Sequence, residues 1–159
     1  MDELQLTFRE AMARVPAPVT VITTMVDGAP TGTTVSAFAS LSIAPPMVVL
    51  ALDNRGGMID RVRAAGRIGV NILAAGQDEV ALRFARRDLP DRFAGLAWRD
   101  DRGLPRIDGA VAWLRCEQLQ LVPGGDHTVI LGHVDDAATD GERSLGYHLR
   151  TFRDVGPSL

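Results

Sequence analysis

The stretch TGTTVSAFASLSIAPPMVVLALD, residues 31–53, indicates the fold more strongly than any other part of the sequence. Apolar and hydroxyl residues alternate along its first half, and mainly apolar residues fill its second half, which is typical of β-strands. Pro45 and Pro46 separate the halves, because proline favours turns over the interior of a strand. We therefore predict two consecutive strands, residues 31–42 and 47–52, joined by a turn.

Strand patterns are more frequent than helix patterns in the rest of the chain. We predict helices at residues 4–15, 56–66 and 77–87, and further strands at residues 19–26, 67–73, 110–122 and 127–139. Short strands separated by turns, with few helical connections, favour an antiparallel barrel or sandwich over a Rossmann fold. Residues 88–109 form a long polar segment, which we expect to cover a site or to contain short elements of its own.

Length, charge and cysteine content narrow the classes of protein. The chain has 159 residues, the size of one domain, so we expect a single domain over residues 1–159. Its 17 basic and 20 acidic residues give a net charge of −3, which argues against a nucleic-acid partner. No apolar run is long enough to span a membrane, and the N-terminus lacks a basic signal-peptide head, so we expect a cytoplasmic protein. The single cysteine, Cys116, excludes a disulfide within the chain.

The strand predicted around Cys116 changes its pattern partway along. Ala112, Leu114 and Cys116 alternate on one face, but Leu119 and Leu121 have the opposite parity. A β-bulge explains such a break, because it adds one residue to one of two paired strands. We therefore predict a bulge after Cys116 and a buried, unreactive thiol.

The alternation in residues 31–42 predicts two contrasting faces. One face carries Val35, Ala37, Ala39 and Leu41, and the other carries Thr34, Ser36, Phe38, Ser40 and Ser42. The first face suits the interior of a narrow barrel, because its side chains are apolar and mostly small. The second face lacks charge, and no charged residue occurs between Asp27 and Asp53. Hydroxyl and backbone donors could bind a flat heteroaromatic ring or phosphate oxygens. The alternative is that this face packs against another subunit or under a loop.

Four segments in this order resemble the short-chain flavin reductases. They are residues 31–53, RIGVNIL at 67–73, LPRIDGAVAWLRC at 104–116 and GGDHTVILGHV at 124–134. Members of that family are NAD(P)H:flavin oxidoreductases that serve two-component flavin-dependent monooxygenases. The resemblance implies a mainly β fold: an antiparallel Greek-key split β-barrel with flanking short helices, homodimeric, with flavin near the subunit interface. It also implies that FMN or FAD is reduced by NADH or NADPH and passed to a monooxygenase.

The same resemblance implies which residues bind flavin. The isoalloxazine edge would be contacted by Thr33, Thr34, Val35 and Ser36. The ribityl chain and phosphate would be contacted by Ser40, Leu41 and Ser42, and the phosphate side by Asn54 and Arg55. Arg92 and Phe93 match a segment that closes over the ligand, and Tyr147 matches an aromatic residue that walls the pocket. The chain departs from the family at residues 56–58, GGM, where many relatives carry hydroxyl residues. Most other arginines in RFARRD, residues 83–88, are expected to be exposed helix-face charges.

Gly125, Asp126 and His127 match the nicotinamide-side motif of the family. His127 would position the nicotinamide, and Asp126 would fix the turn or the imidazole tautomer. Two other roles compete with this one. A zinc site needs clustered ligands, but His133 lies six residues further along the strand, about 20 Å away, so we expect no metal site. A loop histidine without a function is the other alternative.

Three functions from different classes fit these observations. The first is a reductase that uses NADH, or NADPH, to reduce a diffusible flavin for a separate oxygenase. The second is a split-barrel oxidoreductase that retains its flavin and acts on its own organic substrate. The third is a non-catalytic flavin-binding protein. The GDH motif at 125–127 favours the first two, because a protein that only holds flavin needs no nicotinamide site.

Overall fold

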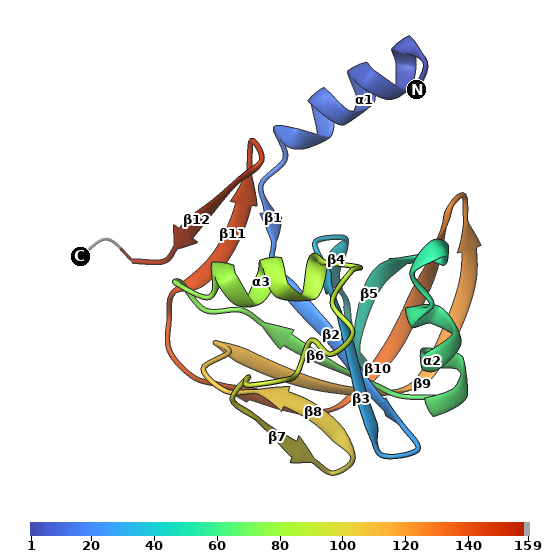
Figure 1. The fold of residues 1–159 in the computed structure, drawn as a ribbon, viewed down its shortest axis with the longest axis vertical. Helices are drawn as coiled ribbons and strands as arrows, with labels where there is room; N and C mark the ends of the chain where they lie inside the picture. Colours follow the sequence, from blue (N-terminus) through green and yellow to red (C-terminus); the bar gives the residue numbers. More distant parts are fainter. Residues whose placement is uncertain (158–159) are drawn as a thin grey trace.

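A computed structural model describes residues 1–157 as a mainly β chain with antiparallel strand pairs (Figure 1). The helices in this part of the chain are α1 (Glu3–Ala13), the 3-10 turn η1 (Asn54–Gly56), α2 (Met58–Ala65) and α3 (Asp78–Ala85). The strands are β1 (Ala17–Pro18), β2 (Thr20–Val26), β3 (Ala29–Val35), β4 (Phe38–Ile43), β5 (Pro46–Asp53), β6 (Ile68–Ile72), β7 (Trp98–Asp101), β8 (Leu104–Ile107), β9 (Ala112–Gly124), β10 (His127–Thr139), β11 (Ser144–His148) and β12 (Thr151–Val155).

The main sheet has seven strands in the order β3-β2-β6-β9-β10-β5-β4. β3 and β4 therefore form its two edges, although only Ser36 and Ala37 separate them in the sequence. Three Cα–Cα steps from Val35 to Phe38 cover at most about 11 Å. The sheet must therefore curl until its two edges come close together, and Figure 1 shows β3 and β4 meeting in this way.

The structure divides the single strand predicted at residues 31–42, so the predicted faces are wrong beyond Val35. Val35 is buried as expected, but Ala37, Ala39 and Leu41 are exposed. Phe38, expected on the hydroxyl face, packs instead against the core. The alternation does not continue through the break, because β3 pairs with β2 whereas β4 pairs with β5.

Apolar residues pack on both faces of the main sheet. One core cluster includes Ile22, Leu50 and Ile130, and a second includes Val21 and Phe84. Neighbouring residues of β2 thus belong to different clusters, as expected for a strand covered on both faces. The second cluster connects the sheet to α3 and to residues 88–109, which contain the β7–β8 hairpin. Short elements inside that long polar segment were one of the two predicted outcomes.

The bulge predicted after Cys116 is present between β9 and β10. Cys116 pairs with Val134 and Glu117 with His133, but the next pair is Gln120 with Leu131. β9 therefore has an extra residue there, and Gln118 adopts a positive φ of 49°. The Cys116 side chain is fully buried, and burial raises the pKa of its thiol to about 12.

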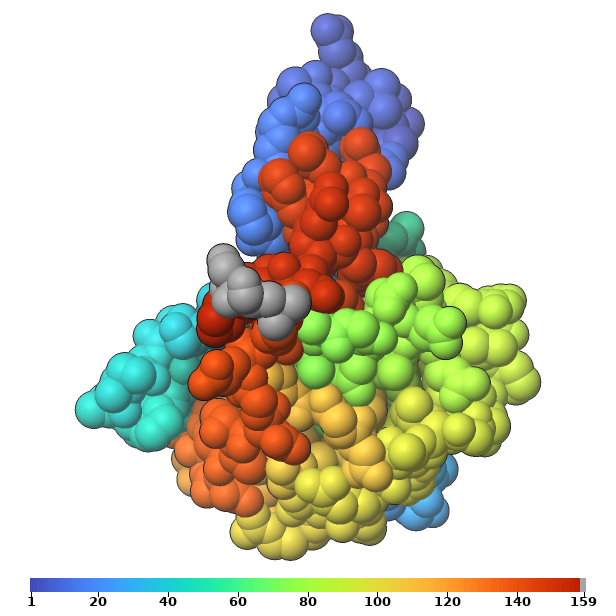
Figure 2. All heavy atoms as spheres, turned by 90° about the vertical axis from the view of Figure 1, so that its left-hand side faces the viewer, coloured from blue at the N-terminus to red at the C-terminus, as the bar shows by residue number. Residues whose placement is uncertain are grey.

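A small sheet outside the main one was not predicted. β11 pairs with β1 on one side and with β12 on the other, and α1 continues from β1. The backbone N–H of Leu149 donates to the carbonyl of Ala13, and Arg150 pairs with Glu10. Figure 2 shows α1 projecting away from the rest of the molecule, and none of its residues is buried. The N-terminal helix is thus confirmed, but its apolar side chains do not contribute to the core.

Candidate functional site

The end of β5 and the beginning of β10 lie side by side. Asp53 pairs with His127 in the register of the two strands. The backbone N–H of Asn54 donates to the carbonyl of Asp126 over 3.1 Å, and the Thr128 hydroxyl donates to Asn54 Oδ1 over 2.7 Å. Residues predicted to contact phosphate and residues predicted to contact nicotinamide are therefore held together by one strand pair.

His127 is oriented by its neighbour Asp126. Its Nδ1 lies 2.6 Å from Asp126 Oδ1, and its side chain remains 39% exposed. His127 lowers the pKa of the Asp126 carboxyl, so this acid stays ionised as a hydrogen-bond acceptor. Because the carboxylate engages Nδ1, the opposite ring nitrogen is available to a ligand.

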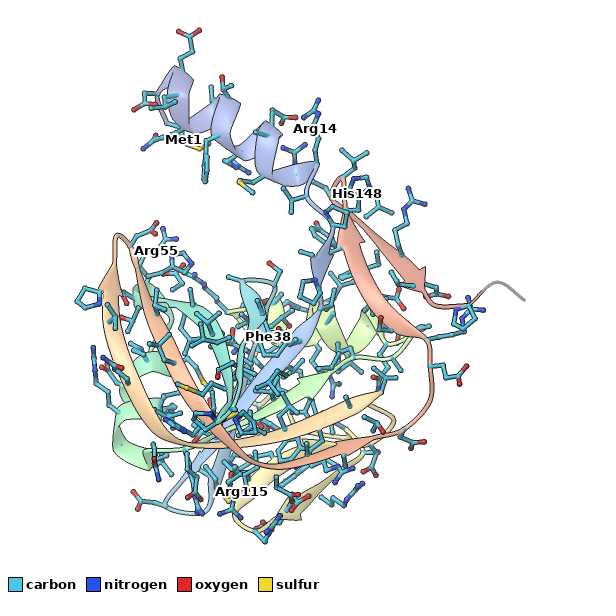
Figure 3. The ribbon with its side chains drawn as sticks, turned by 180° about the vertical axis from the view of Figure 1, so that it is seen from behind. Met1, Arg14, Phe38, Arg55, Arg115 and His148 are labelled. Atoms are coloured by element: carbon cyan, nitrogen blue, oxygen red, sulfur yellow. The ribbon has the colours of Figure 1, made fainter. Side chains whose placement is uncertain are left out.

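Asp53 holds two arginines beside this pair. Arg55 donates from Nε and Nη2 to the two Asp53 carboxylate oxygens over 3.1 and 2.8 Å, and Arg87 donates from Nη2 over 2.7 Å. Hydrogen bonds from Arg55 and then Arg87 hold the pKa of Asp53 well below its usual range. The Arg87 side chain is 58% exposed, as expected, but its pairing with Asp53 was not predicted. We refer to Asp53, Arg55 and Arg87 as the arginine cluster; Figure 3 shows Arg55 at the open end of the curled sheet.

The predicted hydroxyl residues are spread along β5 rather than gathered in one place. Ser36 precedes Ala37, whose carbonyl accepts a hydrogen bond over 3.0 Å from the N–H of Ala51, two residues before Asp53. Ser40 pairs with Val48, and Ser42 with Met47, near the other end of β5. Five residues of a strand separate Val48 from Asp53, which is about 17 Å. The structure therefore does not bring Ser40, Leu41 and Ser42 to the same phosphate position as Asn54 and Arg55.

Residues 33–35 offer backbone rather than side-chain contacts. The Thr34 hydroxyl already donates to the Ala81 carbonyl over 2.6 Å, and Val35 is buried. The Val35 carbonyl accepts from the Thr20 hydroxyl over 2.7 Å. Thr33 pairs with Ile22 on the neighbouring strand and is partly exposed.

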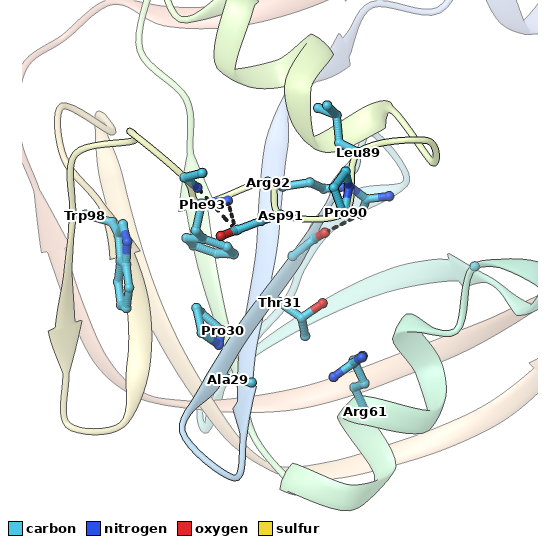
Figure 4. Close-up of a pocket in the computed structure, with 13 residues that line it drawn as sticks. Ala29, Pro30, Thr31, Arg61, Leu89, Pro90, Asp91, Arg92, Phe93 and Trp98 are labelled. Carbon is cyan, nitrogen blue, oxygen red and sulfur yellow. Dashed lines mark hydrogen bonds between the residues drawn. The ribbon is translucent and has the colours of Figure 1, made fainter.

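The three remaining predicted ligand residues lie elsewhere. Arg92 donates from Nη1 to the Gly32 carbonyl over 2.7 Å and lines a pocket of about 630 Å³ together with Arg61 (Figure 4). Phe93 is buried, with its ring 5.0 Å from Phe84. Tyr147 packs against Phe152 on the small sheet. Its neighbour His148 lies far from Arg55 in Figure 3. The structure thus does not bring Tyr147 to His127.

Metal-ligating clusters and membrane-spanning helices are both absent from residues 1–157. No three histidine, cysteine, aspartate or glutamate side chains gather there as they would around a metal ion. No helix within the same range is long and apolar enough to cross a membrane.

The fold and the site define a mainly β domain in which one end of a curled antiparallel sheet presents an aspartate–histidine pair and an arginine cluster. A profile of the flavin reductase like domain matches residues 12–156. The chain therefore belongs to the flavin reductase family.

Named relatives agree with this assignment. The chain is 37% identical over 130 residues to the reductase subunit HsaB of a flavin-dependent monooxygenase from Mycobacterium tuberculosis, covering 81% of this chain and 69% of the relative. It is 34% identical over 154 residues to an NADH-dependent flavin reductase from Rhodococcus sp, covering 94% and 86%. The solved NADH:FAD oxidoreductase SgcE6 of Streptomyces globisporus, in complex with NAD and FAD fragments, superposes with a TM-score of 0.90 at 33% identity, covering 96% and 93%.

Proposed function

We propose that this chain uses NADH to reduce free FMN or FAD and supplies the reduced flavin to a separate monooxygenase. The observation that carries the proposal is the joining of the His127–Asp126 pair to the arginine cluster by the β5–β10 pairing. A phosphate and a nicotinamide bound at these two places would belong to neighbouring ligands. Family membership and the named relatives support the same activity.

The residues of the site fit such ligands. Arg55 and Arg87 supply guanidinium donors that match phosphate oxygens, and Asn54 lies next to them. The Ser36–Ala37 link exposes backbone where the two sheet edges meet, which suits the edge of a flat ring. When NADH and flavin are bound, NADH supplies a hydride to the flavin. The protein's part is to position the two rings, and His127 orients the nicotinamide through the ring nitrogen opposite the one held by Asp126.

The proposal includes the finer fold, the assembly and the location. The short link between β3 and β4 supports a split β-barrel with Greek-key connections. The exposed apolar residues on β4 and α1 support a homodimer that covers them, with the ligand residues of β4 near the interface. A cytoplasmic location fits a chain whose one cysteine is a free thiol. NADH is preferred here over NADPH because a relative that is 34% identical over 154 residues is an NADH-dependent flavin reductase.

NADH oxidation in the presence and absence of added flavin tests the function. We expect anaerobic NADH consumption only when FMN or FAD is supplied, and no effect of a chelator. His127→Ala should lower kcat/KM for NADH by about ten- to a thousand-fold, because a positioning group supplies a few kcal/mol at most. His133→Ala, on the same strand but away from the motif, is the matched control. Folded protein that consumes no NADH with either flavin would refute the proposal, and unchanged kinetics in His127→Ala would remove that residue from it.

A further inference from the structure

A second cationic feature lies next to the arginine cluster. It is the pocket of about 630 Å³ between the first half of β3, the start of α2 and residues 89–94. Figure 4 shows Arg61 pointing from α2 toward Thr31 across this space. We refer to it as the Arg61 pocket. Its volume lies in the range of pockets that enclose a small molecule.

The charges of the Arg61 pocket favour an anion. Within residues 1–157, neither Arg61 nor Arg92 pairs with a carboxylate. Asp91 is the one acid among the lining residues, and it already accepts hydrogen bonds from the backbone N–H groups of Phe93 and Ala94. Burial, and then the neighbouring charge of Arg87, lower the pKa of Arg92. An anion bound here would relieve this accumulation of positive charge.

The opposite wall of the pocket is aromatic and apolar. Trp98 and Pro30 both line it, and Figure 4 shows them on the side away from Arg61. The Phe93 ring meets Trp98 edge-on at 5.3 Å and so holds the indole in place. An aromatic face of this kind stacks well on a flat base. A phosphate at Arg61 and a base at Trp98 together describe a nucleotide.

The position of the pocket identifies which nucleotide it would bind. Gly56 lines the pocket, and its preceding neighbour Arg55 belongs to the arginine cluster. Leu89, which also lines the pocket, lies two residues beyond Arg87, so the pocket borders both arginines of the cluster. A ligand whose first phosphate lies at Arg55 and Arg87 can therefore continue into the Arg61 pocket. FMN ends at that first phosphate, whereas FAD continues with an adenylate.

We propose that the Arg61 pocket binds the adenylate half of FAD and makes FAD the preferred flavin of this chain. The inference rests on the proposed function, because it takes the arginine cluster as the place of the flavin phosphate. Arg61 contacts the added phosphate, Trp98 stacks on the adenine, and Arg92 contributes positive potential from the floor of the pocket.

Equilibrium titrations with FAD, FMN and riboflavin test the assignment. We expect wild-type protein to bind FAD more tightly than FMN. Arg61→Ala should weaken FAD binding by about ten-fold, as expected for one charge-assisted contact, and change FMN binding by less than about two-fold. Arg61→Lys should restore part of the difference. Arg63→Ala, on the exposed side of the same helix, is the matched control and should change neither affinity.

Two further measurements separate the possible outcomes. Adenosine monophosphate should compete with FAD but not with riboflavin in the wild-type protein, which needs no variant. With FMN as the flavin, Arg61→Ala should leave the KM for NADH unchanged. The assignment would be overturned if the wild-type protein bound FAD and FMN equally well, or if Arg61→Ala weakened the binding of both flavins equally. It would also be overturned if Arg61→Ala raised the KM for NADH but left the affinity for FAD unchanged. NADH-dependent reduction of saturating FMN in the same samples would show that the proposed function stands even then.

Discussion

At the scale of single residues, Asp53 holds Arg55 and Arg87 together. Its carboxylate accepts hydrogen bonds from both arginines and so fixes their orientation. The preceding residue, Leu52, pairs with Thr128 of β10. A carboxylate between two guanidinium groups leaves one net positive charge for a phosphate. The low pKa of Asp53 means that this arrangement persists at neutral and mildly acidic pH and is lost only as the pH falls below the usual range of aspartate.

Asp53→Asn should therefore weaken the binding of phosphorylated flavins. An amide cannot accept from both arginines as a carboxylate does, so their orientation is lost and FMN affinity should fall by about ten-fold. Riboflavin, which has no phosphate, should bind as it does to the wild type. The control is Asp60→Asn, which removes the Asp60–Arg63 pair on α2 away from the site. Fluorescence titration gives all the affinities, and a parallel loss for riboflavin would assign Asp53 a structural role only.

At the scale of elements, β6 shows how closely side chains of adjacent strands pack over the main sheet. Gly69 lies in β6, opposite Arg115 of β9, and has no side chain where Trp113 and Thr23 come nearest. A Cβ at this position would overlap the Trp113 ring and lie 2.7 Å from Thr23 Oγ1. Glycine is thus required here for packing rather than for its backbone freedom.

Gly69→Ala should lower the free energy of unfolding by about 1–3 kcal/mol, because overpacking forces the fully buried indole off its rotamer. Gly56→Ala is the matched control, since its new methyl group would meet open space. Urea denaturation followed by far-UV circular dichroism measures both changes. Equal stabilities for the two variants would show that Trp113 moves aside without cost.

The sequence predicted the elements whose patterns are local and regular. The strands expected at 19–26, 67–73 and 127–139 correspond to β2, β6 and β10 within one residue at each end. The β9 bulge was also predictable, because the apolar residues of the strand change from even to odd positions at the bulge. These elements owe their pattern to burial on a defined face, which is encoded residue by residue.

The features that depend on distant partners were not predictable. The alternation in residues 31–42 hides the break at Ser36–Ala37, because small residues suit both a strand and a link between sheet edges. β12 is mostly exposed, so its place comes from pairing with β11 rather than from an apolar pattern. The Arg87–Asp53 contact joins α3 and β5, and no local spacing indicates it. The motifs of the candidate site could thus be recognised in the sequence, but its electrostatic connections could not.

At the scale of the whole molecule, apolar side chains are exposed on two elements, β4 and α1. Ile43 on the edge strand β4 is 86% exposed, and Leu41 on the same strand is 47% exposed. On α1, Leu4, Phe8 and Met12 recur at helical spacing on one face and are also exposed. Such patches usually mark an interface between chains.

Ile43→Asp should therefore convert the proposed dimer into a monomer, because a charge buried at an interface without a partner is strongly unfavourable. Light scattering after size exclusion should show the mass fall from about twice 17.1 kDa to that of one chain. Leu82→Asp, on the exposed face of α3, is the matched control and should leave the mass unchanged. A wild-type mass of one chain would contradict the homodimer itself.

The strand order of the main sheet also has a consequence for the synthesis of the chain. β5 is complete at Asp53, but one of its two neighbours, β10, begins only at His127. Pairings between such distant segments are slow to form, and they cannot begin until the later segment has left the ribosome. The contact between Asp53 and His127 is therefore among the last to be made. A nascent or truncated chain that ends before β10 contains the arginine cluster but lacks His127, so we expect it to leave the reduced nicotinamide of the cell untouched.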